Sequence, residues 1–180
     1  VCIMLMLSGQ NVWVSMAGAT AAGMAAGLAT GILHTFMGIP AILAGILTQL
    51  GLYSINLKTM GKANQAINVD KFDLLVSLRF IRKVPFYKNT ILIVAIAIII
   101  LIAILYWFFG TELGCSLRAT GCNDKMARAQ GINTDLSRVL GLMISNGLVA
   151  LSGAMLCQYQ GFADINMGRG AIVILSLIHI

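Results

Sequence analysis

The first 57 residues of the 180-residue chain contain no Lys, Arg, Asp or Glu. The 12 basic and 6 acidic residues all lie further along the chain. A soluble domain carries about a quarter charged residues, whereas this chain is 10% charged and 59% hydrophobic. A helix crosses the hydrocarbon core of a bilayer with about 20 apolar residues. The charge-free stretch therefore predicts a membrane protein that crosses more than once.

The apolar runs are continuous and lack the period-two alternation of barrel strands. Because backbone groups inside a bilayer must be satisfied internally, spanning elements are helices or closed barrels. The sequence therefore predicts an all-α, polytopic transmembrane helical bundle. We expect a fragment, since the chain starts without an initiator Met, as if partway down a helix, and stops in an apolar run that begins at Ala171.

Between these two partial spans we predict four complete ones. They cover residues 12–33, about 41–57, Thr90–Phe109 and about 139–157. Pro40 precedes the second span, where a missing N–H costs nothing. In the first span small residues recur every four positions, which places them on one helical face where another helix can approach closely. These packing positions are Ala19, Gly23, Gly27 and Gly31.

The most polar part of the chain is residues 58–89, with seven basic and two acidic residues. Apolar residues within 72–84 recur near a 3.6-residue period. This pattern indicates an amphipathic helix on the membrane surface or an extramembrane helix packed on the bundle, and the sequence leaves both open.

Residues 117–133 form a second polar connection between spans. Thr120 and Gly121 predict a turn. Asn123 predicts the N-cap of a short helix, and Asp124 would complement the dipole of that helix. Gly131 predicts the left-handed residue that ends it. A two-turn helix is marginal by itself, so a partner or the neighbouring spans must hold it. A solvated connector is the simpler alternative.

Three runs carry a family resemblance: LRATGCNDKMARAQGIN, NGLVALSGAM and QGFADINMGRGAIVI. With them, residues 1–174 resemble the membrane subunit of bacterial ABC importers of the branched-chain amino acid and ribose permease family. TGILHTFMGIPAILAGILTQLGLYSINLKTMGKAN is most similar to the tryptophan/tyrosine-type branch. The resemblance makes 1–174 a partial permease domain. The last six residues, 175–180, resemble the translation of a sequencing adaptor, and we expect them not to be native.

In that family the loop at about 114–138 holds the cytoplasmic coupling helix, which sits in a groove of a separate ATPase subunit. Cys122 stands where a more ordinary polar residue is expected. The positions that match the coupling motif are Arg118, Asn123, Asp124, Ala127, Arg128, Gly131, Ile132 and Asn133.

The resemblance further implies partners and a location. The protein partners are an ABC ATPase, an extracytoplasmic solute-binding protein and a second permease subunit in a homo- or heterodimer. The ATPase uses ATP and Mg. The location is the lipid bilayer of the bacterial plasma membrane. The chain itself has no GxxxxGK loop for phosphates, and we expect no cofactor, enzymatic chemistry or nucleic-acid partner. Its cysteines lack the spacing of a metal site; they are Cys2, Cys115, Cys122 and Cys157. An amino acid is the expected solute.

Orientation is where two rules conflict. The resemblance puts residues 114–138 in the cytoplasm and 58–89 outside, whereas the positive-inside rule favours the reverse, with seven basic residues against four. We follow the motif. Ser145 and Asn146, inside the fourth span, are candidates for the translocation path or for interhelical hydrogen bonds. His34, at the end of the first span, is a packing residue or a pathway residue.

Two rival functions make different demands on the sequence. An ion-coupled secondary transporter needs an ionisable residue near the middle of a span, and an intramembrane enzyme needs a nucleophile and base or a metal cluster. The four complete spans contain no charged residue at membrane depth. The sequence therefore favours the permease.

Overall fold

A computed structural model of the chain describes residues 1–61, 64–66, 90–166 and 168. The amphipathic segment predicted within 72–84, the apolar run from Ala171 and the tail at 175–180 lie outside these residues.

The described chain is a helical bundle, as the sequence predicts. Its only strands form one short antiparallel pair, in which Asn64 lies opposite Asp164. The elements in chain order are α1 (Cys2–Leu7), α2 (Val12–Thr35), α3 (Ala41–Met60), β1 (Asn64–Ala66), α4 (Thr90–Phe109), α5 (Glu112–Cys122), α6 (Asp124–Ala129), α7 (Thr134–Gln160) and β2 (Phe162–Asp164).

Among the described residues, three helices, α2, α3 and α7, are long and apolar enough to cross a membrane. A fourth span is obtained if α4 and α5 are counted as one broken span, because residues Val94–Phe109 and Glu112–Cys122 meet at an 80° bend. The sequence prediction of four spans is therefore at the upper end of what the described residues support.

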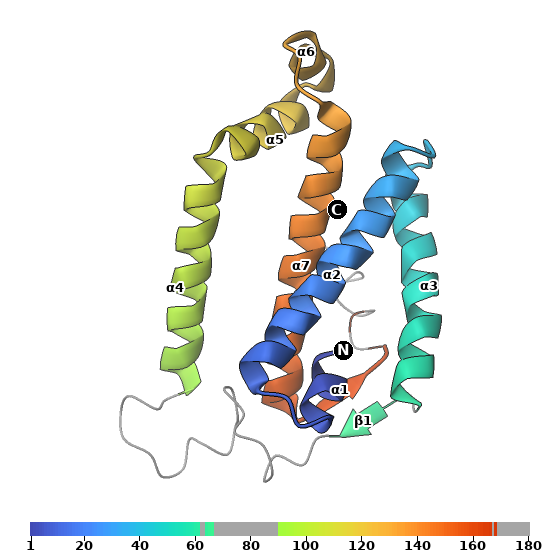
Figure 1. Ribbon diagram of the computed structural model, residues 1–180, viewed down its shortest axis with the longest axis vertical. Coiled ribbons are helices and arrows are strands. Elements are labelled where there is room, and N and C mark those ends of the chain that lie inside the picture. Colours follow the sequence, from blue (N-terminus) through green and yellow to red (C-terminus); the bar gives the residue numbers. More distant parts are fainter. Residues whose placement is uncertain (62–63, 67–89, 167, 169–180) are drawn as a thin grey trace, which may run out of the picture.

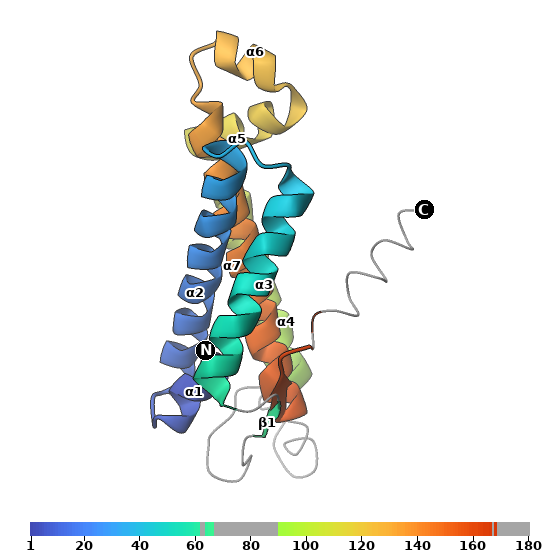
Figure 2. The same cartoon turned by 90° about the vertical axis from the view of Figure 1, so that its right-hand side faces the viewer.

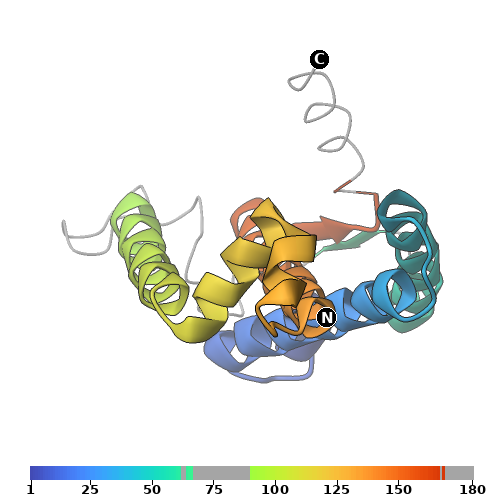
Figure 3. The ribbon, with the colours of Figure 1, turned by 90° about the horizontal axis from the view of Figure 1, so that it is seen from above.

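The helices α2, α3 and α7 form the bundle, and α4 stands to one side, joined to it through α5 (Figure 1). The α2–α3 connection and α5–α6 lie at one end of the bundle, and α1, β1 and β2 lie at the other (Figures 1 and 2). Seen from above, α5 runs from α4 towards the centre of the molecule (Figure 3).

The main contact of the bundle is between α2 and α7, where glycines of α2 face the α7 backbone. A Cβ on Gly27 would lie 2.5 Å from the Leu142 carbonyl oxygen and 2.7 Å from the Met143 Cα. A Cβ on Gly31 would lie 3.1 Å from the Val139 Cα. Small side chains therefore let two helix backbones approach more closely than larger ones would permit.

The other two positions of the predicted small-residue face continue this contact. Gly23 faces Ala150, and Ala19 is buried beside Ala154 in a core cluster completed by α1. The structure thus places all four of these residues towards α7. The residues of α1 in this cluster are Cys2, Ile3 and Met6.

Two boundary predictions are wrong. The turn expected at Thr120 and Gly121 is absent, because both residues lie inside α5, where the Thr120 hydroxyl donates to the Ser116 carbonyl at 2.8 Å. The fourth span begins at Thr134 rather than near Val139, because the Asn133 side chain caps it, accepting from the Leu136 N–H at 3.2 Å.

Candidate coupling segment at one end of the bundle

The sharp bend between α4 and α5 is built from a cap and a glycine. The Thr111 side chain accepts a hydrogen bond from the Gly114 N–H at 3.4 Å and caps α5. Gly114 is buried, and a Cβ there would lie 2.5 Å from the Phe109 Cα. Any larger residue would push α5 away from the end of α4, so this glycine fixes the direction in which α5 leaves the membrane-spanning helix.

The short helix α6 has the start and the end that the sequence predicts. Asn123 Oδ1 accepts from the Met126 N–H at 3.1 Å, which satisfies one of the free donors at the helix N-terminus. Gly131 has φ +84°, the left-handed conformation that favours glycine. The Ile132 N–H then donates to the Ala127 carbonyl at 3.1 Å, so the chain turns back towards α7.

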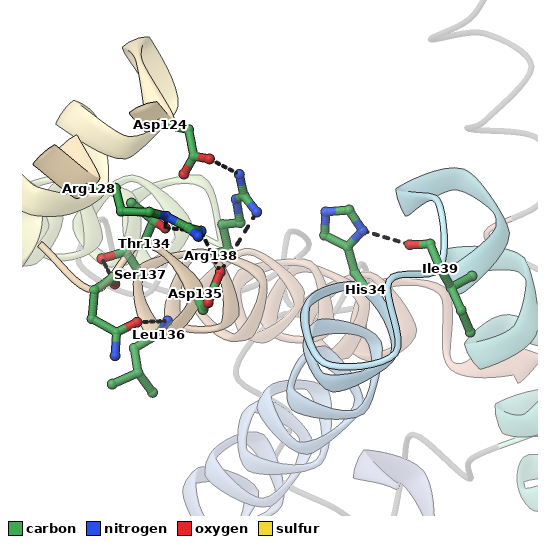
Figure 4. Close-up of polar contacts among 10 residues, drawn as sticks. His34, Ile39, Asp124, Arg128, Thr134, Asp135, Leu136, Ser137 and Arg138 are labelled. Atoms are coloured by element: carbon green, nitrogen blue, oxygen red, sulfur yellow. Dashed lines mark hydrogen bonds and ion pairs between the residues drawn. The ribbon is translucent and has the colours of Figure 1, made fainter. Parts of the chain in front are cut away.

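Two ion pairs join α6 to the first turns of α7 (Figure 4). Arg138 Nη2 lies 2.7 Å from Asp124 Oδ2. Arg128 Nη2 lies 3.2 Å from Asp135 Oδ1 and donates to the Thr134 hydroxyl oxygen at 2.8 Å. Each arginine therefore spans the connection between the two helices.

Burial at the same junction strengthens this attachment. Ala127 is 3% exposed and Thr134 is 2% exposed, whereas the four charged groups are partly in solvent. Partly exposed ion pairs are each worth only about 0–1 kcal/mol, so the buried Ala127 and the hydrogen bonds of Arg128 are needed as well. Together they hold in place a six-residue helix that would not be stable alone.

The eight residues matched to the coupling motif take different places. Asn123, Gly131 and Asn133 shape the backbone, Asp124 and Arg128 bind α7, and Ala127 is buried. Ile132 is half-buried, and Arg118 is exposed on α5.

Sequence reasoning missed the α7 residues that receive α6, which are Thr134, Asp135 and Arg138. A signal for the helix start was present, since Asn133 before Thr-Asp is a typical N-cap sequence.

The outer face of α6 is exposed in the part of the chain that the structure describes. Met126 is 59% exposed although it is apolar, and its neighbour Lys125 is exposed too. Both lie on the same short helix as buried Ala127, so the helix has one side against the bundle and one side free. An exposed Met beside a cation suits a helix that enters a groove of another protein.

The two residues proposed for the translocation path are in different settings. Asn146 lies in the α2–α7 contact. Its side-chain Nδ2 donates to the Leu142 carbonyl at 2.9 Å, and its backbone carbonyl oxygen faces Gly23. Ser145 is exposed on α7. The structure therefore places Asn146 within the helix packing and Ser145 on the outside of this bundle.

A cavity of about 390 Å³ lies beside the junction of α6 and α7. Its walls come from α2, α3, α5 and α7, and both His34 and Arg138 line it. His34 Nδ1 lies 2.8 Å from the Ile39 carbonyl oxygen in the α2–α3 connection. In the part of the chain that the structure describes, no cluster of His, Cys, Asp and Glu has the composition of a metal site.

Comparison with known proteins gives a consistent family signal. The family model described as "Branched-chain amino acid transport system / permease component" matches residues 1–180. A tyrosine transport system permease protein of Clostridioides difficile is 42% identical over 153 residues, covering 84% of this chain and 48% of the relative. An uncharacterized protein of Rickettsia prowazekii is 38% identical over 138 residues, covering 76% and 46%.

A less similar relative is named for a different substrate. The autoinducer 2 import system permease protein LsrC of Yersinia pestis is 34% identical over 151 residues, covering 82% of this chain and 40% of the relative. The chain thus spans about half the length or less of these relatives. No solved structure shows significant similarity to it.

Proposed function

Because the chain belongs to the family of branched-chain amino acid transport system permease components, a family of multi-pass proteins of the bacterial inner membrane, we propose that it is the permease subunit of a binding-protein-dependent ABC importer. In this proposal the helices form part of the path for a small solute, and the subunit itself performs no chemical step. The energy comes from a separate ATPase subunit that contacts the α5–α6 segment.

The observation that carries the proposal is the attachment of α6 to α7. A displacement of α6 is transmitted to α7 through the Asp124–Arg138 pair and the contacts of Arg128. The close α2–α7 contact at Gly27 then passes the movement into the bundle. A short helix that is both exposed to a partner and fixed to a spanning helix can bias a two-state bundle.

The ATPase subunit is proposed to receive the free side of α6 in a groove. Met126 provides apolar area, and burying a Met side chain is worth about 1.5–3 kcal/mol. Asp124 and Arg128 are occupied within the chain, so their role is to hold α6 in position rather than to bind the ATPase directly.

The other partners follow from the same mechanism. ATP and Mg are bound and used by the ATPase, because the sequence of this chain has no GxxxxGK phosphate loop. A solute-binding protein outside the cell delivers the solute, and a second permease subunit, identical or different, completes the path. With α5–α6 on the ATPase side, the α2–α3 connection also faces the cytoplasm (Figure 1).

An amino acid is the proposed solute. The relative at 42% identity is named a tyrosine permease, whereas the one named for autoinducer 2 is 34% identical. The order of these identities supports an amino acid over autoinducer 2.

The test is uptake of radiolabelled amino acids by proteoliposomes that contain the full-length subunit together with its ATPase and its solute-binding protein. The proposal predicts uptake that requires enclosed ATP and Mg and that continues when ionophores collapse all ion gradients. Uptake that is abolished by the ionophores and does not depend on ATP would instead establish an ion-coupled secondary transporter. Uptake of autoinducer 2 but of no amino acid would correct the solute while leaving the permease function in place.

A further inference from the structure

We infer that the cavity between α2, α3, α5 and α7 binds an amino acid in its zwitterionic form, and that the bound carboxylate competes with Asp124 for Arg138. The site would let solute accumulated on the ATPase side slow the importer. This inference rests on the proposed function for the choice of ligand and for the side of the membrane.

His34 supplies the first half of the argument, because its hydrogen bond fixes which ring nitrogen carries the proton. The Ile39 carbonyl can only accept, so His34 Nδ1, 2.8 Å away, must be the donor. In the neutral imidazole, Nε2 is then a hydrogen-bond acceptor. Figure 4 shows this second nitrogen on the side of the ring towards Arg138, and both residues line the cavity.

Two hydroxyl groups of the cavity, those of Thr120 and Ser137, add acceptors rather than donors. The Thr120 hydroxyl donates to the Ser116 carbonyl at 2.8 Å, and the Ser137 hydroxyl donates to the Asn133 carbonyl at 3.1 Å. With its one proton used inside its own helix, each oxygen can only accept from a ligand. His34, Thr120 and Ser137 therefore favour a ligand that brings N–H donors, as an ammonium group does.

Arg138 supplies the second half, since its guanidinium has five N–H donors and no acceptor. It pairs with Asp124 at 2.7 Å and approaches Asp135 at 3.9 Å, which leaves donors for a further carboxylate. An α-amino acid carries its ammonium and its carboxylate on one carbon, so a single ligand can offer N–H donors to these acceptors and a carboxylate to Arg138.

Size and apolar lining are also suitable for an amino acid. The volume of about 390 Å³ lies within the roughly 300–1,000 Å³ typical of small-molecule pockets. Ala41, Leu117 and Leu142 also line the cavity and provide an apolar wall for a side chain.

The position of Arg138 connects this cavity with α6. A ligand carboxylate that draws the guanidinium away from Asp124 weakens one of the two ion pairs that fix α6 to α7. By thermodynamic linkage, anything that strengthens the Asp124–Arg138 pair must weaken binding of the ligand to the same extent. Occupation of the cavity therefore lowers the efficiency with which α6 drives the bundle.

The experiment measures equilibrium binding of radiolabelled L-tyrosine to the purified full-length permease without its solute-binding protein. The key variant is His34→Asn, because the Asn amide nitrogen can still donate to the Ile39 carbonyl, whereas its amide oxygen, attached at Cγ, does not reach the position of the His34 Nε2 acceptor. We expect about tenfold weaker binding in this variant. Ser152→Ala, which removes an exposed hydroxyl of α7 that bonds only within its helix, is the matched control and should bind as the wild type does.

Two analogues test the zwitterion directly. Tyramine lacks the carboxylate and 3-(4-hydroxyphenyl)propanoate lacks the ammonium, so each should bind at least about tenfold more weakly than L-tyrosine. In proteoliposomes, millimolar L-tyrosine on the ATPase side should slow ATP-driven uptake in the wild type and much less in His34→Asn.

The inference is overturned if the wild type does not bind L-tyrosine, if His34→Asn binds it equally well, or if either analogue binds as tightly. Those results leave the proposed function standing as long as ATP-driven uptake of an amino acid is observed. Absence of any ATP-driven uptake would contradict the proposed function itself, whatever the cavity binds.

Discussion

Replacement of Gly27 by Ala should separate the two helices that form the centre of the bundle. The new Cβ would lie 2.5 Å from the Leu142 carbonyl oxygen and 2.7 Å from the Met143 Cα. Real Cβ atoms essentially never approach another atom within 3.0 Å. Both obstructing atoms belong to the α7 backbone, so no side-chain rotation relieves the clash, and the helices must part by at least about half an ångström.

The size of the effect follows from two opposing terms. Overpacking of a close contact costs about 1–3 kcal/mol, while replacing Gly by Ala inside a helix gains up to about 1 kcal/mol. Gly51 in α3 isolates the second term, because nothing lies within 4 Å of a Cβ built there. The free energy of unfolding of Gly27→Ala should therefore be about 1–3 kcal/mol below that of Gly51→Ala.

The assay is reversible unfolding of the two variants and the wild type in mixed detergent micelles, followed by circular dichroism as the SDS fraction rises. Gly51→Ala should unfold at the same SDS fraction as the wild type or a higher one, and Gly27→Ala at a lower one. Equal stability of the two variants would refute the account of a close α2–α7 contact, because the strain that distinguishes them would then be missing.

Two further predictions concern the attachment and the start of α6. Asp124→Arg should reduce the amount of solute carried per ATP hydrolysed, because two arginines then face each other. Adding Arg138→Asp should restore part of that coupling. A double variant that carries no more solute per ATP than the single variant would argue against the ion pair as the connection. Asn123→Ala should destabilise α6 by about 1 kcal/mol and speed hydrogen exchange at the Met126 amide. Asn11→Ala is the control, because Asn11 stands at a helix start without a side-chain cap bond, and it should leave hydrogen exchange in α2 unchanged. Equal effects of the two substitutions would exclude the capping argument.

Local signals in the sequence were sufficient for most helices of the described chain. The predicted third span has the bounds of α4, and the first differs from α2 by two residues at its end, because long apolar runs and flanking polar residues mark both limits. The Asn123 cap and the Gly131 stop were found for the same reason, since each depends on conformational preferences of a few neighbouring residues.

Features that depend on contacts distant in sequence could not be predicted in this way. The pairing of Asp124 with Arg138 depends on how α6 folds back on α7, and nothing in the spacing of the two residues specifies it. The turn predicted at Thr120 and Gly121 was wrong because a helix tolerates one glycine when its neighbours are held by packing, and Thr120 is buried. The β1–β2 pair joins segments about 100 residues apart through three residues on each strand, too few for a recognisable pattern.

The central claim, that α6 receives the force of an ATPase, is tested most directly by ATP-driven uptake in reconstituted full-length transporter carrying Met126→Glu. Met126 is 59% exposed, so the charge should leave the fold intact while removing an apolar contact worth about 1.5–3 kcal/mol. Met37→Glu is the matched control, since Met37 is 64% exposed in the α2–α3 connection at the same end of the bundle. The account predicts at least about tenfold loss of uptake for Met126→Glu, with unchanged stability, and near-normal uptake for Met37→Glu. Wild-type uptake by Met126→Glu would contradict it.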